Sequence, residues 1–511
     1  MNVLSLASWR GRGMQRLAIC VAAGALSACV SMSGIQSNAH VNAPAVTTDA
    51  TSLPGEGGLW PGASWATGIG GAPLQQLIDE ALAGNPGLVL AAARVAAARA
   101  MVDAAGAASK PQVGAGFSTT RERFSENSIY PPPFGGAYVT DNELALNLSY
   151  DFDFWGRHGA ELRSALSQSK VAEAEHDAAR LLLATTVAKA WVQLARQYAQ
   201  ADMANQQVAL RDRLNRLTQQ RFSAGLDTQS DNLQSLVQVA NLNAERAQWN
   251  EAIALTRNQL AALLGQGPDR GLRISPASLP TDAAIALPDQ LPLGLLGRRP
   301  DIVAARWQVE AAQSDIKVAQ TAFYPNVNLS AMIGLSSLSW SSFLSHGSMV
   351  DGIGPALHLP IFEGGALRAQ LKNRVAAYDG AVATYNQALT QALHDVADTV
   401  QSLRAAEIEK NNQQTASDAA ERAMQLARQR QQVGTVNMLQ VVGAEIAYLS
   451  QRKLEIDTRA RRADLRIGLI KALGGGFEAD AEGLSLEPNR SAEGPSSTSR
   501  SNRPPLANAA P

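Results

Sequence analysis

The stretch Leu144-Ala145-Leu146-Asn147-Leu148-Ser149-Tyr150-Asp151-Phe152-Asp153-Phe154 places an apolar or aromatic residue at every even position and mostly polar residues between them. This period of two predicts a β-strand with one apolar and one polar face. A length of about ten residues suits a strand that crosses a membrane at a tilt. A half-buried strand of a soluble sheet gives the same pattern, so the rest of the chain has to decide between the two.

Four stretches in all show this alternation, at about 112–120, 142–154, 326–336 and 352–362. The first and third follow Pro111 and Pro325, each of which ends a helical segment. A sheet with open edges in lipid would leave backbone groups unpaired, at a cost of several kcal/mol each. Spanning barrels begin at about eight strands. If these strands span a membrane, several chains must therefore share one barrel.

The residues after Trp155-Gly156 return to the helical period and keep it to about Phe222, which corresponds to roughly 100 Å of helix. Gly225 breaks this helix, and a second one is expected from about Thr228 to Leu264. The two helices predict an antiparallel hairpin that turns at Gly225. We expect narrow seams, as in coiled coils, at Val187, Trp191, Leu194 and Tyr198 in the first helix, and at Leu233, Val237, Ala240, Ala244 and Ala247 in the second.

The whole pattern then occurs a second time. The segments Pro86–Pro111 and Pro300–Pro325 have equal length, and Gly434 follows Gly225 at the same spacing as Gly474 follows Gly265. The sequence therefore predicts two structural repeats, 73–275 and 276–478, with the second hairpin turning at Gly434. The expected seam of its first helix consists of Leu389, Leu393, Val396, Val400 and Leu403.

Residues 1–28 are interpreted as a secretory signal, because three arginines precede the short apolar run Leu17–Leu26. The following Leu26-Ser27-Ala28-Cys29 resembles the bacterial lipobox. That resemblance implies cleavage before Cys29 and an N-acyl diglyceride anchor on this residue, and Val30 in place of Asp favours the outer membrane. An ordinary cleaved signal with a chance cysteine is the alternative.

Composition restricts the remaining possibilities. The formal net charge of −1 gives no indication of a nucleic-acid partner. Only Cys20 and Cys29 are present, so we expect no disulfide. Residues 29–72 are interpreted as an extended leader and 479–511 as a disordered tail. No apolar run after the signal is long enough for a spanning helix. The dispersed histidines and the lack of a catalytic constellation predict no metal site, no cofactor besides the lipid and no enzyme.

The segment Leu291–Ile302, LPLGLLGRRPDI, is similar to the signature of TolC-family outer-membrane efflux proteins. Phe323–Pro325 and Ser149–Arg157 also look like that family, and the lipobox points to its lipoprotein branch, the NodT type associated with RND pumps. The resemblance implies an α+β membrane protein. Three chains would form a 12-stranded outer-membrane β-barrel continued by a periplasmic α-helical tunnel. The partners implied are a periplasmic adaptor and an inner-membrane pump.

In that family the hairpin tips close the periplasmic entrance, partly through acidic rings. Asp231 falls where the first repeat of the family carries an Asp, although an acid favoured by the helix dipole explains it equally well. In the second repeat, the positions of the family's Asp and Tyr hold Gly443 and Gln431, and Gln440 is neutral too. An acidic ring is thus missing here or displaced toward Glu445. We expect an entrance held by amide hydrogen bonds and packing, with a weaker preference for cations.

Three functions remain open at this point. The first is a passive duct of a tripartite efflux system for drugs or other small toxic solutes. The second is the outer-membrane component of a type I protein-secretion system, which the sequence hardly separates from the first. The third is a lipid-anchored periplasmic coiled-coil scaffold without a pore, which the alternating strands disfavour.

Overall fold

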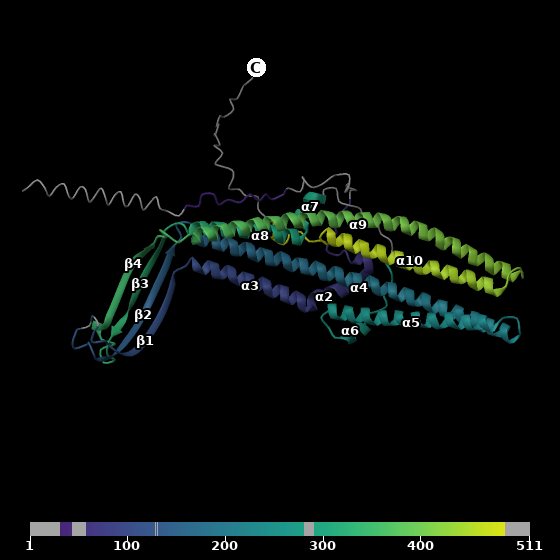
Figure 1. Cartoon of the computed structure of the whole chain (residues 1–511), viewed down its shortest axis with the longest axis horizontal. Coiled ribbons are helices and arrows are strands. Elements are labelled where there is room, and N and C mark those ends of the chain that lie inside the picture. The colour runs from purple at the N-terminus through teal and green to yellow at the C-terminus, as the bar shows by residue number, and fades with distance from the viewer. Residues whose placement is uncertain (1–30, 43–57, 128, 130, 281–290, 486–511) are drawn as a thin grey trace, which may run out of the picture.

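The computed structural model describes residues 31–42, 58–280 except 128 and 130, and 291–485. A sheet lies at one end of an elongated molecule, the tips of two helical hairpins lie at the other, and shorter helices pack between them (Figure 1). The predicted signal 1–28, Cys29 and most of the predicted tail lie outside the described residues.

The sheet consists of β1 (Gln112–Arg123), β2 (Tyr138–Phe152), β3 (Asn326–Ser337) and β4 (Met349–His358). Its order is β1-β2-β3-β4 and every neighbouring pair is antiparallel. The four predicted strands are confirmed. The central pair joins the two halves of the chain, since Leu144 of β2 lies opposite Leu335 of β3.

Two strands end earlier than the alternation predicted. β2 ends at Phe152 instead of 154, because the chain turns there: the Phe154 N–H donates to Phe152 O at 2.9 Å. β4 ends at His358 instead of 362, shortly before Pro360, which has no N–H to donate. Apolar residues continue the alternation beyond both ends, which is why the pattern alone overestimated the strands.

Two long hairpins form the opposite end of the molecule (Figure 1). The first consists of α4 (Arg157–Ser223) and α5 (Gln229–Leu263), the second of α9 (Ala366–Gln432) and α10 (Met438–Ala472). α4 and α9 have 67 residues each, or roughly 100 Å at 1.5 Å per residue. Gly225 (φ 73°) and Gly434 (φ 76°) lie at the turns in the left-handed region.

The sequence pattern predicted seams in three helices, and the structure agrees with two of them, α4 and α9. Val187, Trp191 and Leu194 of α4 are buried, as are most of the expected seam residues of α9. The expected seam of α5 was wrong, because all five of its residues are exposed in the chain. α5 instead packs against α4 through another stripe. The buried residues of that stripe are Val239, Ile253, Thr256, Leu260 and Ala261.

Shorter helices fill the middle of the molecule: α2 (Thr67–Gly84), α3 (Pro86–Ala108), α6 (Pro268–Leu272), α7 (Leu291–Arg298) and α8 (Pro300–Thr321). The 3-10 turn η2 (His346–Ser348) lies in the connection between β3 and β4, at the sheet. α2 begins before Pro73, where helix was expected, and bends at Gly71 (φ 67°). One core joins α2 to α4, α5 and α10, with Leu74 and Trp191 among its members. A second core joins α8 to α9 and α10 around Ile302 and Leu389.

The predicted disordered tail begins too early. Residues 479–485 are packed, because the Ala479 N–H donates to Gly297 O at 2.8 Å and Trp307 Nε1 donates to Leu484 O at 2.7 Å. Leu484 is 1% exposed and lies in a small core with Val171 and Val303. The sequence around these residues is polar, so a single buried leucine did not outweigh the composition.

Candidate functional site: the sheet and the hairpin tips

The sheet has two chemically different faces. Residues that pair across neighbouring strands share a face, and Phe117, Leu144, Leu335 and Met349 form one such row. The opposite face is mostly small and polar. The apolar face carries Val113, Ala115, Phe117, Leu144, Leu146, Leu148, Val327, Leu329, Ile333, Leu335, Ile353 and Leu357, and the other face carries Gly114, Gly116, Asn147, Ser149, Asn328, Ser330, Gly352 and Gly354.

Nothing in the described chain covers the apolar face along the outer strands. Val113 and Leu357 are each 69% exposed and Ile353 is 77% exposed. Every residue of β1 is exposed, and nearly every residue of β4. A soluble protein would not leave such a surface and two unpaired strand edges in water. The single chain therefore leaves an apolar face and two strand edges without a cover.

Aromatic side chains mark both ends of this apolar band. At the end far from the helices, the ring centroid of Phe117 lies 6.1 Å from those of Trp340 and Phe343. At the end near the helices, Trp155 stacks on Tyr324 at 4.6 Å and donates from Nε1 to Pro325 O at 2.7 Å. Aromatic residues in these two positions are typical of proteins that cross an outer membrane.

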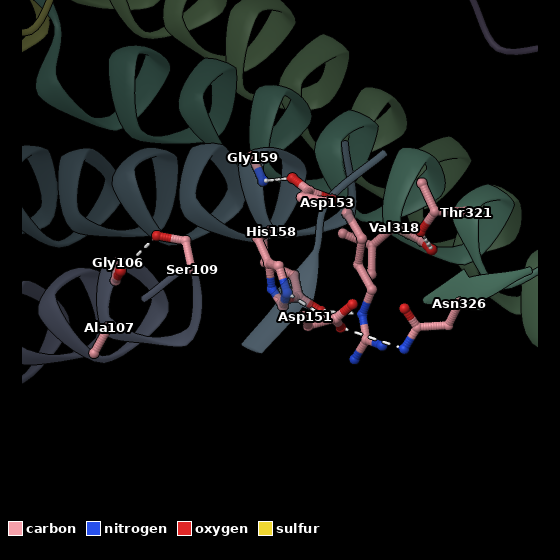
Figure 2. A network of polar contacts seen from close by, with 12 residues as sticks. Gly106, Ala107, Ser109, Asp151, Asp153, His158, Gly159, Val318, Thr321 and Asn326 are labelled. Carbon is pink, nitrogen blue, oxygen red and sulfur yellow. Dashed lines mark hydrogen bonds and ion pairs between the residues drawn. The ribbon is translucent and has the colours of Figure 1, made fainter. Parts of the chain in front are cut away.

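Polar contacts fix the sheet to the helices at the end of β2 (Figure 2). Asp153 accepts a hydrogen bond from the Gly159 N–H at 3.1 Å and so caps the first turn of α4. Asp151 Oδ2 lies 3.3 Å from His158 Nε2 and accepts from Asn326 Nδ2 at 3.3 Å. These contacts join β2, α4 and β3, which gives both carboxylates a structural role at the junction.

The first hairpin tip is held by its own polar residues. Arg221 forms two hydrogen bonds with Asp227, at 2.8 and 2.9 Å. Thr228 and Asp231 form a capping box at the start of α5, in which the Asp231 N–H donates to Thr228 Oγ1 at 3.3 Å. Hydrogen bonds from the Thr228 hydroxyl and N–H lower the pKa of Asp231. Asp231 thus caps the helix as an exposed, ionised carboxylate.

The second tip carries amides where the first carries an acid. Asn437 Oδ1 accepts from the Gln440 N–H at 3.1 Å and caps α10. Gln440 is exposed and Gln431 is partly buried. Gly443 faces open space, since a Cβ atom at this position would have no heavy atom of the described residues within 4 Å.

Glu445 is not a free replacement for the acid missing at Gly443. Its carboxylate accepts from Arg428 Nη2 at 2.7 Å and from Nε at 2.9 Å, and its side chain is only 15% exposed. The pair joins α9 to α10 inside the hairpin. This pairing argues against a displacement of the acidic ring to Glu445.

A second set of polar contacts joins the two hairpins to each other. Arg196 Nε of α4 lies 2.7 Å from Asp457 Oδ1 of α10, and Gln200 donates to the same oxygen at 2.8 Å. Lys453 of α10 pairs with Glu245 of α5. Burial raises the pKa of Glu245, but the hydrogen bond and charge of Lys453 outweigh this and lower it. These contacts leave no pattern in the sequence, since Lys453 and Glu245 are 208 residues apart.

Within the described ranges, none of the helices is both long enough and apolar enough to cross a membrane. The same part of the chain contains no group of three His, Cys, Asp or Glu residues arranged to hold a metal ion.

The fold and these two ends define the class of protein. A sheet with one apolar face, aromatic residues at both ends of that face and two unpaired edges is a segment of a membrane wall. The hairpins extend from the helical side of this wall over roughly 100 Å. These features are typical of an outer-membrane channel whose sheet continues into long helices.

The sequence pattern of the outer membrane efflux protein family matches residues 77–266 and 291–475, and the chain belongs to that family. It is 35% identical over 365 residues to the fusaric acid resistance protein FusA of Burkholderia cepacia, covering 70% of this chain and 69% of that protein. It is 30% identical over 428 residues to the multidrug resistance outer membrane protein MdtP of Escherichia coli K12, covering 82% and 88%. The crystal structure of the outer membrane protein VceC from Vibrio cholerae matches with a TM-score of 0.74 and 38% identity, over 82% of this chain and all of that one.

Proposed function

We propose that three copies of this chain form a passive duct through the outer membrane that exports small toxic solutes. An inner-membrane pump of the RND type and a periplasmic adaptor deliver these solutes. The observation that carries the proposal is the sheet, whose apolar face and two edges are exposed in the single chain. Three such sheets supply twelve strands, which is above the minimum of about eight for a closed barrel.

The helices support the same assembly. The exposed stripe of α5 that contains Leu233 and Val237 has no partner within the described part of the chain, and a neighbouring hairpin would cover it. The equal lengths of α4 and α9, and of α5 and α10, support two structural repeats per chain. Three chains would then place six similar hairpins around one tunnel.

Deletion of the gene tests the proposal directly. With the pump expressed, we expect the deletion strain to become more susceptible to at least one toxic compound across a broad panel. The purified protein should form trimers that dissociate on heating and should conduct ions in a planar bilayer. Unchanged susceptibility to every compound, or a monomer without conductance, would contradict the efflux function.

The alternatives make different predictions. FusA and MdtP are named for resistance to small molecules, which favours small solutes over secreted proteins. A secretion ATPase encoded beside this gene, with unchanged drug susceptibility, would favour the secretion system instead. A coiled-coil scaffold without a pore would give neither heat-dissociable trimers nor conductance.

We also propose that Cys29 carries the lipid anchor of the lipoprotein branch. Ser31 follows Cys29 by two residues, and its carbonyl accepts a hydrogen bond from Arg368 near the start of α9. Met32 and Ile35 pack beside Leu371 in the same region. This region lies where the strands meet the helices, and two residues span no more than about 7 Å. Acyl chains on Cys29 could therefore enter the membrane next to the sheet.

Metabolic labelling with a fatty acid tests the anchor. The wild-type protein and a Cys20→Ser control should both take up the label, because Cys20 lies inside the signal. The Cys29→Ser variant should lose it. Labelled Cys29→Ser protein would contradict the proposal.

The periplasmic entrance is proposed to be closed at the second tip by amides and packing instead of an acidic ring. Gln440→Ala and Gln431→Ala should raise single-channel conductance and leakage of a large antibiotic, whereas Gln432→Ala serves as a control on the same helix. Gly443→Asp should raise the preference for cations, since a side chain there meets open space. The proposal fails if both Gln→Ala variants conduct and leak like the wild type.

A further inference from the structure

The two outer strands of the sheet, β1 and β4, each present an unpaired backbone edge. Both are exposed along almost their whole length, whereas β2 and β3 are partly buried. β1 runs away from the helices and β4 runs back toward them (Figure 1). A contact between β4 of one copy and β1 of a second copy is therefore antiparallel, like every other pair in the sheet.

These two edges are offset along the strand direction. Phe117 of β1 and Met349 of β4 lie on the same row of the ladder. From that row β1 continues outward to Arg123, whereas β4 begins there and runs inward to His358. When the outer ends of β4 and of the second copy's β1 are aligned, Met349 lies opposite Arg123 and His358 lies opposite Gly114. In this alignment every residue of β4 gains a partner.

The two faces restrict the register further. A shift by one residue would turn the polar face of one copy toward the apolar face of the next. The odd residues of β1 and of β4 share the apolar face, so only shifts by two residues keep the faces continuous. Near the aligned register, Asp351 can then lie opposite Thr119, Arg121 or Arg123.

Of these three residues, the available positive charge makes Arg121 the best partner for Asp351. Asp351 lies on the apolar face opposite Ile333, and neither Asp351 nor Arg121 has a hydrogen-bond or ion-pair partner among the residues that the structure describes. Arg123 is already engaged, because it donates to Glu126 at 2.8 Å and to Gly136 O at 3.1 Å. Side chains directly opposite each other have Cβ atoms about 4.5–5.5 Å apart, which is within reach of an ion pair.

We propose that β4 of one copy pairs with β1 of a second copy in the register that sets Asp351 opposite Arg121, and that this ion pair fixes the register of the seam. The proposal rests on the barrel proposed above and adds how its copies join. The register that aligns the outer ends of β4 and β1 is also the register that sets Asp351 opposite Arg121. The pair also neutralises two charges on a face that otherwise meets lipid, where unpaired charges are disfavoured.

Cysteine cross-linking tests the register. The mature protein should have no free thiol, because Cys29 is the only cysteine after the signal and would carry lipid. Arg121→Cys is combined with Asp351→Cys, and in two matched controls with Met349→Cys or with Ile353→Cys. After mild oxidation and heating without reductant, only the Asp351→Cys combination should give covalent dimers and trimers. The control pairs are diagonal, at about 7–8 Å between Cα atoms, which is beyond the reach of a disulfide.

Charge reversal tests the role of the ion pair. Asp351→Arg and Arg121→Asp alone should each reduce the trimer that survives in detergent before heating, and the double variant should restore it. Cross-linking through Met349 or Ile353 instead of Asp351, or a double variant no better than the singles, would overturn the proposal. If the wild-type protein forms conducting trimers, such results contradict only the proposed register, and the proposed barrel still stands. A wild-type protein without trimers or conductance would contradict the barrel itself.

Discussion

Gly474 shows how one residue can be fixed by its surroundings. It ends α10 with φ +91°, and a Cβ atom on it would lie 1.7 Å from the backbone oxygen of Arg298. Gly434 at the hairpin turn has a similar φ of +76° but no heavy atom within 4 Å of the same position. Both glycines adopt a left-handed conformation, and only Gly474 also permits a close backbone approach.

We therefore expect Gly474→Ala to be much more damaging than Gly434→Ala. The alanine at 434 adds backbone strain of about 1–2 kcal/mol. The alanine at 474 adds this strain and overpacking, for a total of about 2–5 kcal/mol. Thermal unfolding followed by circular dichroism measures the difference. Equal melting temperatures would contradict the close approach of Gly474 to Arg298.

Arg299 of the LPLGLLGRRPDI segment is a buried cation that joins three helices. It donates to Asp301 at 2.6 and 3.0 Å, to Asp395 at 3.1 Å and to Ala472 O at 3.4 Å. Burial lowers the pKa of Arg299, but the hydrogen bonds and charges of the two aspartates outweigh this and raise it. Its role is to hold α8 against α9 and the end of α10.

Arg299→Met should destabilise the protein by about 1.5–3 kcal/mol, the range for hydrogen bonds to charged groups. Arg298→Met is the matched control. Arg298 lies over the ring of Trp60 and pairs with the half-exposed Glu478, so we expect a loss of no more than about 1 kcal/mol. Denaturant unfolding of both variants decides the point, and a larger loss for Arg298→Met would refute this role of Arg299.

At the scale of elements, the two hairpins are joined by α10. Its Lys453 pairs with Glu245 of α5, and its Asp457 pairs with Arg196 of α4. We expect these contacts to hold the second hairpin close to the first. Because the side chains of both pairs are 23–41% exposed, each pair is worth about 0.2–1 kcal/mol.

Glu245→Gln should therefore raise the leakage of a large antibiotic up to about fivefold, as 1 kcal/mol allows. The lowered pKa of Glu245 predicts the pH dependence. Its stabilising effect is complete above the ordinary value of 4.5 and is lost as the pH falls through the lower value in the folded protein. Liposomes that contain the wild-type protein should thus leak more only at acid pH. Liposomes that contain the Glu245→Gln variant should leak to the same extent at every pH in that range. An equal rise in leakage at acid pH in both proteins would contradict the dependence of leakage on the ionised Glu245.

Periodicity predicted the helices but not always their buried stripes. The seam of α9 was identified correctly, because Leu389, Val396 and Val400 form a regular apolar stripe that the core of this chain covers. The stripe of α5 that the periodicity predicted contains Leu233 and Val237, and it is exposed. An apolar stripe indicates burial in the assembly, and it does not say whether the same chain or another one provides the partner.

At the scale of the whole molecule, the exposed stripe of α5 makes a prediction about assembly. Val237→Lys places a charge where a neighbouring hairpin is expected to pack, and should strongly reduce the heat-dissociable trimer. Gln238→Lys adds the same charge on an exposed polar position of the next residue and should leave the trimer intact. Gel electrophoresis without heating compares the two variants. An intact Val237→Lys trimer would exclude the stripe from the subunit contact.

The sequence by itself determined the strands, the long helices, their turning glycines and the family, because period two, period 3.6 and left-handed glycines are local consequences of backbone geometry. Only the tertiary structure decided which stripe of α5 faces α4, where the tail stops packing, and that Glu445 and Lys453 have partners. It also decided the offset between β1 and β4. These features depend on contacts between residues far apart in the chain, and such contacts leave no periodic signal in the sequence.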